Sequence, residues 1–456
     1  MLARRFLYTG TCSTIMTYEE TIQYLFNSAP LFQHVGGAAY KEGLSTTHIL
    51  DAHFNHPHNQ YKTIHIAGTN GKGSCAHTIA AILQHTGLKV GLYTSPHLVD
   101  FRERIRINGE MMPQQYVIDF VEKERSFFEP LHPSFFELTT ALAFKYFAEQ
   151  HVDVAVIEVG LGGRLDCTNI ISPILSVITN ISFDHTQFLG NTLAQIASEK
   201  AGIIKHKVPV IIGECNAETR SVFEHKAHEV EAPILFAEDN KEVLSSELSD
   251  LYGHKLRHYT TRSFGDIYGE LTGECQIKNA NTILCALHSL SKIFSVTHED
   301  ITYAFEHVCE MTGLRGRWQI LQEHPTIICD TGHNTGGWQY LAHQLAQIAT
   351  SGNKLHIVFG MASDKDIERV MSTLPHEACY YWTKASVKRA TSEQTIANIA
   401  TKYDLHGKTY SNVAKAYEAA VNNASTNDYI YVGGSSFIVA DLLRYKQTAL
   451  PHEENT

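Results

Sequence analysis

A glycine-rich loop with a single lysine follows an apolar segment near the start of the chain. Residues 63–67 have the composition of a buried strand, residues 68–74 read Gly-Thr-Asn-Gly-Lys-Gly-Ser, and a helical pattern begins at Cys75. Glycines allow backbone N–H groups to face an anion, and the following helix adds positive potential at its N-terminus. A lysine at this place would reach the outer phosphates of a nucleotide. The sequence therefore predicts an ATP site formed by Gly68, Thr69, Asn70, Gly71, Lys72, Gly73 and Ser74.

This loop departs from the common P-loop, because only two residues separate Gly68 from Gly71 and a glycine follows Lys72. The alternative is a glycine-rich tight turn whose lysine is simply solvated. The order of strand, loop, lysine and helix favours the phosphate site.

A carboxylate and an imidazole follow two further apolar strands. Glu158 ends the run Val154–Ile157, and His185 comes shortly after the run 174–180. The carboxyl ends of parallel strands form the usual ligand crevice of an open α/β sheet, and magnesium prefers oxygen ligands beside substrate phosphates. Either residue alone is more often solvated, but the pair beside a phosphate loop predicts a metal site.

Three histidines lie within six residues, at His53, His56 and His58. A metal site is one interpretation, but the Pro and Asn residues among them favour an exposed loop. The nine cysteines include no C-x-x-C pair, and a chain of 456 residues has core enough without disulfides. We expect reduced thiols in a cytoplasmic protein.

The overall charge argues against two classes of partner. The formal net charge is −11, which is a poor basis for binding a nucleic-acid backbone. No run of eighteen apolar residues could cross a bilayer, so we expect no membrane contact. Residues 1–15 contain Arg4 and Arg5 and no acid, which is typical of a transit peptide, but Met16 offers a natural start. We expect 1–15 to be a disordered extension.

Two sets of apolar strands alternate with helical patterns, which indicates an α/β protein with parallel sheets. The polar segment 216–265 is weakly patterned and is expected to carry little chemistry. The expected strands are 63–68, 154–160, 174–180 and 209–213 in the first set, and 326–330, 354–360, 378–383 and 428–433 in the second.

Three segments resemble the motifs of the folylpolyglutamate synthase/dihydrofolate synthase family within the Mur ligase superfamily. They are Gly68–Ser74, Tyr93-Thr-Ser-Pro-His-Leu98 and the run from Glu158 to Asn169. The resemblance implies a P-loop-containing parallel-sheet ATPase domain followed by a smaller Rossmann-like α/β domain. It divides the chain into a Mur-ligase-type ATP-binding domain at 16–313, a hinge at 314–324 and a C-terminal glutamate-ligase domain at 325–456.

The resemblance also implies roles for residues of the first domain. Ser95 and Glu158 would hold one magnesium ion, and Glu158 and His185 a second. Lys200, which the residues alone present as a helix-surface lysine, would be carbamylated and become an anionic metal ligand. Lys72, Lys200 and His185 would thus be the catalytic groups. The pterin or folate would contact Ser134, Phe136, Glu137, Leu165, Asp166 and Cys167, although Phe135 and Phe136 also suit the start of an amphipathic helix.

Further roles fall on the second half of the chain. The resemblance gives ATP contacts to Asn279, Arg317, Asp330 and His333. The family motif D-G-A-H-N-P is changed here to Asp-Thr-Gly-His-Asn-Thr at 330–335. Asp364, Lys365 and Arg389 would bind the glutamate substrate, although such a charge cluster is usually a solvated loop.

The implied reaction is ligation. The γ-phosphoryl group of ATP passes to a carboxylate of dihydropteroate or a folate, and the amine of L-glutamate attacks the acyl phosphate to give the amide, ADP and phosphate. We expect a monomer with small-molecule substrates only. The alternatives are a Mur-type amino acid ligase of cell-wall precursor synthesis, or a nucleotide-binding regulatory protein that does not ligate.

Overall fold

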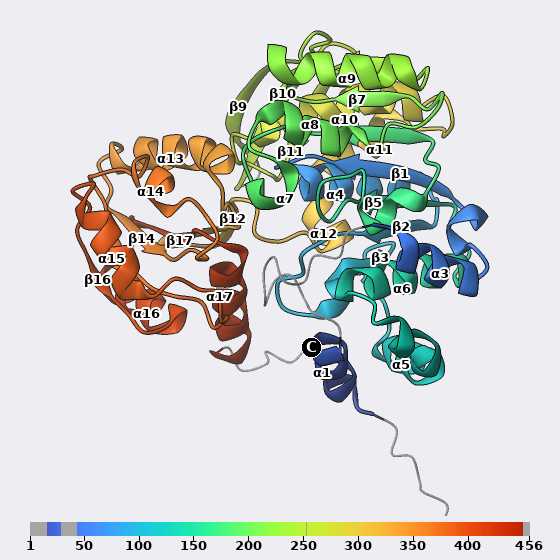
Figure 1. Ribbon diagram of the computed structural model, residues 1–456. Helices are drawn as coiled ribbons and strands as arrows, with labels where there is room; N and C mark the ends of the chain where they lie inside the picture. Colours follow the sequence, from blue (N-terminus) through green and yellow to red (C-terminus); the bar gives the residue numbers. More distant parts are fainter. Residues whose placement is uncertain (1–15, 29–42, 252, 450–456) are drawn as a thin grey trace, which may run out of the picture.

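The computed structural model describes residues 16–28, 43–251 and 253–449. The expected extension 1–15 lies outside these residues. Figure 1 shows a larger unit, in blue to yellow, that contains about the first two thirds of the chain and a smaller unit, in orange and red, that contains most of the rest.

An eight-stranded sheet forms the centre of the larger unit. From β2 to β8 its neighbouring strands are parallel, as predicted, while β3 and β4 add an antiparallel edge that the sequence patterns did not predict. In spatial order the strands are β4 (Glu110–Met111), β3 (Ile105–Ile107), β2 (Val90–Tyr93), β5 (Val154–Glu158), β1 (Lys62–Ala67), β6 (Leu175–Ile178), β7 (Val210–Ile212) and β8 (Ile234–Phe236).

Helices cover both faces of this sheet, because alternate strand residues point to opposite sides. Val154 and Val156 pack into one apolar cluster, while Ala155 and Ile157 pack into another on the opposite face. The first face carries α4 (Lys72–His85), α10 (Gln276–Leu290), α11 (His298–Glu306) and α12 (Val308–Thr312). The second carries α1 (Tyr18–Ser28), α3 (Ser45–His53), α5 (Gln114–Phe128), α6 (Phe135–Glu149), α8 (Leu193–Ala201) and α9 (Ala217–Glu229), and the short α7 (Thr186–Leu189) precedes α8.

The weakly patterned segment 216–265 forms regular secondary structure over most of its described residues. After α9 and β8, it forms most of a three-stranded antiparallel sheet made of β9 (Val243–Leu251), β10 (His254–Thr261) and β11 (Asp266–Gly269). Most of β9 is exposed, so its polar sequence lacks the apolar runs by which buried strands are recognised.

The smaller unit is a second α/β unit, with helices packed on a six-stranded sheet. Its strands run parallel except for β12, which lies in the expected hinge and pairs antiparallel with β13. In spatial order they are β12 (Gln319–Glu323), β13 (Thr326–Asp330), β17 (Tyr429–Gly433), β14 (Leu355–Phe359), β15 (Cys379–Trp382) and β16 (Gly407–Thr409). The helices are α13 (Thr335–Ala349), α14 (Ile367–Met371), α15 (Glu393–Thr401), α16 (Val413–Asn423) and α17 (Ser436–Ala449).

The histidine-rich segment ends one helix and enters a 3-10 turn. His56 Nδ1 and His58 Nδ1 contact the two carboxylate oxygens of Asp51 at 2.6 and 2.8 Å, and His53 contacts Glu124. Within the described ranges, no three His, Cys, Asp or Glu side chains come together as a metal site. The 3-10 turns are η2 (Pro57–Gln60), η3 (Phe101–Arg104), η4 (Glu129–Leu131) and η5 (Cys167–Ile170).

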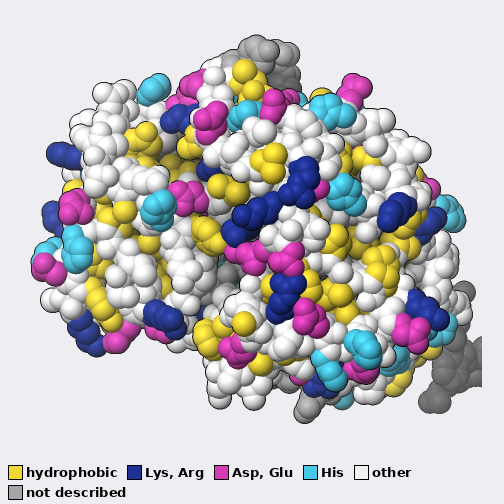
Figure 2. All heavy atoms as spheres, turned by 90° about the horizontal axis from the view of Figure 1, so that it is seen from above, with side chains coloured by type: hydrophobic (Ala, Val, Ile, Leu, Met, Phe, Trp, Pro, Cys, Tyr) yellow, Lys and Arg dark blue, Asp and Glu magenta, His cyan; other side chains and the backbone are white. Residues whose placement is uncertain are grey.

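The surface has mixed charge. On the face shown in Figure 2, basic and acidic side chains are interspersed among small hydrophobic patches. None of the helices in the described ranges is both long and apolar enough to cross a lipid bilayer. The eight cysteines of the described part are free thiols.

Candidate active site

The glycine loop connects β1 to α4 and is held by close backbone contacts. Gly68 has φ +144°, and a Cβ there would lie 1.9 Å from Thr179 Oγ1. Gly71 caps α4 with φ +82°, and a Cβ there would lie 2.3 Å from Asn279 Oδ1. Both positions therefore require glycine for conformation and for space. The loop presents the N-terminus of α4 and Lys72 together, which is the arrangement of an anion site.

Glu158 lies beside this loop because β5 pairs with β1 in parallel register, with Glu158 opposite Ile66. Its side chain is 5% exposed, lies 3.9 Å from Lys72 Nζ and accepts a hydrogen bond from the Ser95 backbone at 3.2 Å. Burial raises the pKa of Glu158, while Lys72 opposes the rise. The structure thus brings together Lys72, Ser95 and Glu158, as predicted.

Lys200 is a buried lysine rather than the helix-surface lysine that its sequence alone indicates. It is 4% exposed, and its ammonium group donates to the Gly68 carbonyl at 2.9 Å. Burial first, and then Lys72, lowers the pKa of Lys200 to about 7. At pH 7 roughly half of this side chain is therefore an uncharged amine at the base of the phosphate loop.

His185 lies after β6 on the same cavity as Lys200. Burial lowers the pKa of His185 to about 3, so its imidazole is neutral and suited to bind a metal. Glu158 lines a neighbouring, smaller cavity instead.

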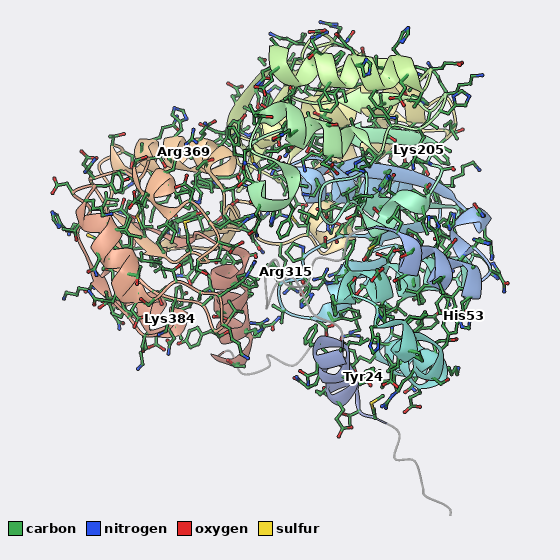
Figure 3. All side chains as sticks on the ribbon, in the orientation of Figure 1. Tyr24, His53, Lys205, Arg315, Arg369 and Lys384 are labelled. Atoms are coloured by element: carbon green, nitrogen blue, oxygen red, sulfur yellow. The ribbon has the colours of Figure 1, made fainter. Side chains whose placement is uncertain are left out.

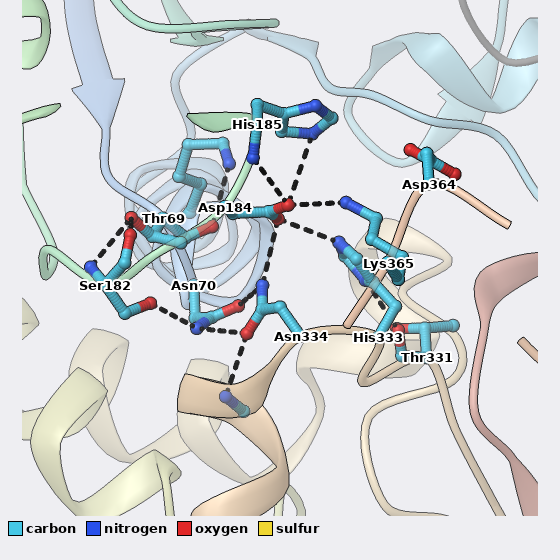
Figure 4. A network of polar contacts seen from close by, with 12 residues as sticks. Thr69, Asn70, Ser182, Asp184, His185, Thr331, His333, Asn334, Asp364 and Lys365 are labelled. Carbon is cyan, nitrogen blue, oxygen red and sulfur yellow. Dashed lines mark hydrogen bonds and ion pairs between the residues drawn. The ribbon is translucent and has the colours of Figure 1, made fainter. Parts of the chain in front are cut away.

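Asp184 connects the two units, which the sequence patterns did not indicate (Figure 4). Its carboxylate contacts Lys365 Nζ at 2.5 Å, Asn334 Nδ2 at 3.0 Å and His333 Nε2 at 3.4 Å. Burial acts to raise the pKa of Asp184, but His333, Lys365 and His185 hold it well below the usual value. Asp184 is therefore an anion that binds side chains of the smaller unit to the larger one.

The phosphate loop also contacts the smaller unit directly. The Asn70 side-chain amide donates to Asn334 Oδ1 at 3.0 Å, and the Asn334 amide donates to Asn70 Oδ1 at 2.9 Å. Asn334 also caps α13 by accepting from the Gly337 backbone at 2.9 Å. The start of α13 is thus fixed against the phosphate loop.

Two of the predicted nucleotide residues of the later segments, Arg317 and Asn279, lie against the same loop. Arg317 Nη2 would lie 3.1 Å from a Cβ at Gly73, and its Nη1 donates to Thr331 Oγ1. Asn279 is in close contact with Gly71, as noted above. Asp330 is buried and accepts from the backbone of Trp318 and Gly332, both at 2.7 Å.

A cavity of about 260 Å³ opens next to these groups, and residues of both units line it. The larger unit contributes Gly68, Thr69, Lys72, Lys200 and Phe136, and the smaller unit contributes His333, Lys365, Arg389 and Phe437. Phe136 packs against the Tyr93 ring at 5.9 Å between centroids and leaves room only for a glycine at 160. An aromatic wall beside cationic groups suits a flat ligand with a carboxylate.

Three residues predicted to touch the pterin have structural hydrogen bonds here. Ser134 and Glu137 form the capping box of α6, with bonds of 2.7 and 3.2 Å. Asp166 accepts from the Leu161 backbone at 2.8 Å and from the backbone and hydroxyl of Thr168 at 3.0 and 2.5 Å. Ser134, Leu165, Asp166 and Cys167 also line the cavity, whereas Glu137 does not.

The residues predicted to bind glutamate are divided between two positions. Lys365 and Arg389 line the cavity, and Arg389 Nη1 contacts Asp364 Oδ2 at 3.3 Å. Asp364 is exposed and is not part of the wall. Sequence reasoning missed the contacts of Asp184 and Asn334. It also missed the cap of α6, which the S-x-x-E spacing of Ser134 and Glu137 would have indicated.

Comparisons with known proteins agree with this arrangement. Residues 66–287 match the family model of the Mur ligase middle domain, and residues 316–436 match that of the Mur ligase, glutamate ligase domain. The chain is 31% identical over 424 residues to the dihydrofolate synthase/folylpolyglutamate synthase of Bacillus subtilis, covering 88% of this chain and 94% of that protein.

It is 32% identical over 448 residues to a Haloferax volcanii protein named "Probable bifunctional folylpolyglutamate synthase/dihydropteroate synthase", covering 93% of this chain but only 50% of that protein. The chain thus spans about half the length of that relative. A solved structure of a bifunctional folylpolyglutamate synthase/dihydrofolate synthase with Mn, AMPPNP and L-glutamate bound matches 95% of this chain and 98% of its own, with 28% identity and a TM-score of 0.77. The chain therefore belongs to the folylpolyglutamate synthase/dihydrofolate synthase family of Mur ligases and is an ATP-dependent ligase that adds glutamate.

Proposed function

We propose that this ligase joins L-glutamate both to dihydropteroate and to reduced folates through an acyl phosphate. In the first step the acceptor carboxylate attacks the γ-phosphorus of ATP and ADP leaves. In the second step the glutamate amine attacks the acyl carbon, the carbon–oxygen bond to phosphate breaks, and the amine loses its proton. Positioning and charge neutralisation dominate such phosphoryl transfer. The lysines around the site can neutralise the developing charge, and the proposed mechanism needs no covalent nucleophile from the protein.

The buried carboxylate of Glu158 fits a magnesium ion held together with Ser95. A carboxylate buried this deeply needs a counter-charge, and Lys72 at 3.9 Å is only a partial one. Magnesium takes few protein ligands and completes its shell with water and phosphate oxygens, so two side chains suffice. When bound, the ion would neutralise charge on the transferring phosphoryl group. We place a second ion at His185, with Glu158 and a carbamylated Lys200 as further ligands.

Carbamylation of Lys200 is supported by its surroundings. The reaction needs an uncharged amine, and burial lowers the pKa of this lysine to about 7. The product would be an anion beside Lys72, which replaces repulsion between two cations with attraction. Lys200 would then orient the ligands at the phosphate loop rather than donate to the Gly68 carbonyl.

The two units would act as the domains 16–313 and 325–456, with 314–324 as the hinge. Lys365 and Arg389 would bind the carboxylates of glutamate and bring its amine to the cavity that Phe136 lines. The contacts of Asp184 and Asn334 would hold the two domains together in a closed form. Closure would keep out water, which would otherwise hydrolyse the acyl phosphate. Arg317, Asp330, Asn279 and His333 would bind the nucleotide. We expect a cytoplasmic monomer.

We propose that one acceptor site serves both substrates, because the pterin ring can stack on Phe136 whether or not a glutamate tail follows it. The Asp166 oxygens are already used by Leu161 and Thr168, so we propose that Asp166 mainly shapes the loop that faces the pterin.

The observation that carries the proposal is the convergence of the phosphate loop, Lys200, Phe136 and two cationic residues of the smaller unit on one cavity. The test is purified protein with ATP, labelled glutamate, and dihydropteroate or tetrahydrofolate supplied separately. Glutamate-dependent release of ADP with both acceptors is expected. Activity with tetrahydrofolate alone would contradict the dual role, and ATP hydrolysis without ligation would indicate a regulatory protein instead.

A further inference from the structure

A second, smaller cavity lies beside the first and has a different lining. Its volume is about 100 Å³, and it shares Ser95, Pro96, His333 and Ser436 with the larger cavity. This volume is several times the roughly 10–15 Å³ that one water requires. The space suits a compact ion, and it is too small for a nucleotide or a folate.

Three arginines line this cavity without an acidic partner. Within the described part of the chain, Arg106, Arg315 and Arg317 form no ion pair with Asp or Glu, whereas six other arginines do. Arg106 is 7% exposed, and its Nη1 donates to the Gly109 carbonyl at 2.8 Å. Its Nε is buried with no hydrogen-bond partner. A buried guanidinium that has no ion pair and leaves one N–H without an acceptor is costly, which points to a missing ligand.

Two carboxylates of the cavity wall, Glu103 and Glu158, offset only part of the charge, because neither forms an ion pair with these arginines within the described residues. Both oxygens of Glu103 accept backbone hydrogen bonds, from Leu98 at 2.7 Å and from Val99 and Asp100 at 3.1 Å. Glu158, which also lines the cavity, is engaged by the Ser95 backbone and Lys72. Burial lowers the pKa of Arg106, Glu103 opposes this fall, and the charge of Arg315 adds a smaller lowering, so the two guanidinium groups lie close enough to repel.

The position of Arg106 is fixed by a glycine. A Cβ on Gly313 would lie 2.7 Å from Arg106 Cζ and 2.8 Å from both terminal nitrogens. The guanidinium therefore packs flat on the backbone between α12 and β12. Arg315, two residues later, is exposed and lies between the two units in Figure 3, at the outer side of the cavity.

A neutral histidine adds an acceptor to this basic wall. His77 Nδ1 is 2.8 Å from Thr312 Oγ1, and the Thr312 hydroxyl gives its one proton to the Val308 carbonyl at 2.5 Å. Nδ1 must then be the donor, which leaves Nε2 of this cavity-lining ring with a lone pair. Such an acceptor suits an oxyanion that keeps a proton, as hydrogen phosphate does, and does not suit a carboxylate.

From this geometry we infer that the smaller cavity is a binding site for orthophosphate, the product released when the amide forms. The inference rests on the proposed acyl-phosphate reaction, which frees orthophosphate at the wall that the two cavities share. Arg106 and Arg315 bind the ion there while the amide product still fills the larger cavity. Phosphate thus leaves by a path separate from that of the folate.

The test is calorimetric titration of orthophosphate into the whole protein with ADP and Mg²⁺ present, so that the phosphate loop is already filled. Arg315→Ala should weaken phosphate binding about fivefold or more, and Arg315→Glu should abolish it, because a charged hydrogen-bond donor is lost or reversed. Arg315→Lys should retain most of the affinity. Arg369→Ala on α14, an exposed arginine of the smaller unit, is the matched control and should bind as the wild type does (Figure 3).

Product inhibition by phosphate gives the functional readout. In Arg315→Ala the inhibition constant for phosphate should rise by the same factor, while KM for ATP changes less than about twofold. A parallel rise in KM for ATP would place Arg315 in the nucleotide site and overturn the inference. Glutarate that displaces phosphate at similar concentrations would also overturn it, in favour of a site for a carboxylate tail. Full ligase activity without any phosphate binding would reject this phosphate site and leave the proposed function intact. Phosphate binding that depends on Arg315, in a protein that does not ligate, would keep the anion site and reject the proposed function.

Discussion

Replacing Lys200 is the most informative single change in this active site. The lysine is buried at the base of the phosphate loop, and burial with Lys72 nearby lowers its pKa to about 7. At pH 7.5, roughly three quarters of such a side chain is the free amine, against about one part in a thousand for an ordinary lysine. The reactive fraction is thus several hundred times larger, and carbon dioxide should add to the amine near neutral pH.

The pH dependence has a definite sign. In the folded protein Lys200 loses its proton near pH 7, whereas in the unfolded chain it keeps the proton up to about pH 10.4. Between these values the unfolded chain binds more protons than the folded protein, so the free energy of unfolding should rise with pH. Over the whole range the rise is about 5 kcal/mol, which is the cost of burying the charged form of Lys200 below pH 7. In carbon-dioxide-free buffer Lys200→Met should remove this slope. Ligase activity of the wild type should fall below pH 7, where the amine is protonated and cannot be carbamylated.

Three measurements test the role of Lys200. The wild type equilibrated with ¹³C-bicarbonate should give a carbamate resonance that Lys200→Met lacks. Activity of the wild type should drop in carbon-dioxide-free buffer and return with bicarbonate. Lys200→Ala should be nearly inactive and partly rescued by formate or acetate, which supply the missing anion. Full activity of Lys200→Ala without rescue would refute the reasoning and leave Lys200 as a buried structural lysine.

Further predictions concern the remaining charged groups. Lys72→Ala should lower kcat about a hundredfold or more while circular dichroism shows an intact fold, and near-normal turnover would contradict the ATP site. Asp184→Asn should cost about 3–5 kcal/mol in denaturant unfolding near neutral pH, because it leaves Lys365 buried without its anion, and a loss under 1 kcal/mol would show that the contact is dispensable. That stabilisation should be fully present above about pH 4 and be lost only in stronger acid, since the pKa of Asp184 lies well below the usual value. Asp166→Ala should reduce use of dihydropteroate more than use of tetrahydrofolate polyglutamate, because the glutamate tail retains binding energy, and equal losses measured as kcat/KM would argue against this.

The local parts of the site could be predicted from the sequence because their causes are local. The strand before Gly68, the glycines at 68 and 71, and Lys72 lie within eleven residues, and each acts through backbone geometry at its own position. Glu158 could be placed because a carboxylate that ends an apolar run emerges at the carboxyl edge of the sheet. The central strands of both sheets were predicted for the same reason, since buried strands are continuous apolar runs.

Other features depend on contacts between distant segments. Asn70 and Asn334 are 264 positions apart, and Asp184 and Lys365 are 181 apart, so no pattern within either segment indicates that they meet. The burial of Lys200 is of this kind too, because α8 shows a lysine among polar neighbours and only the packing of the helix against the phosphate loop removes it from water. The strands β9 and β16 were missed because their side chains are largely exposed.

A protein with a net charge of −11 must nevertheless hold ATP, glutamate and a folate, which are all anions. Its charges are separated by depth. Acidic and basic groups are mixed on the face in Figure 2, where salt screens them beyond about 10 Å, whereas Lys72, Lys200 and Lys365 line one cavity between the two units. Charges that are poorly screened act strongly on whatever enters. Asp184 neutralises part of this positive charge through its contact with Lys365. A glutamate carboxylate that binds Lys365 would replace Asp184 as its anionic partner, so Lys365 keeps one anion throughout. Substrate binding can then proceed without leaving a buried cation or anion unpaired, which is the costly outcome in a dry site.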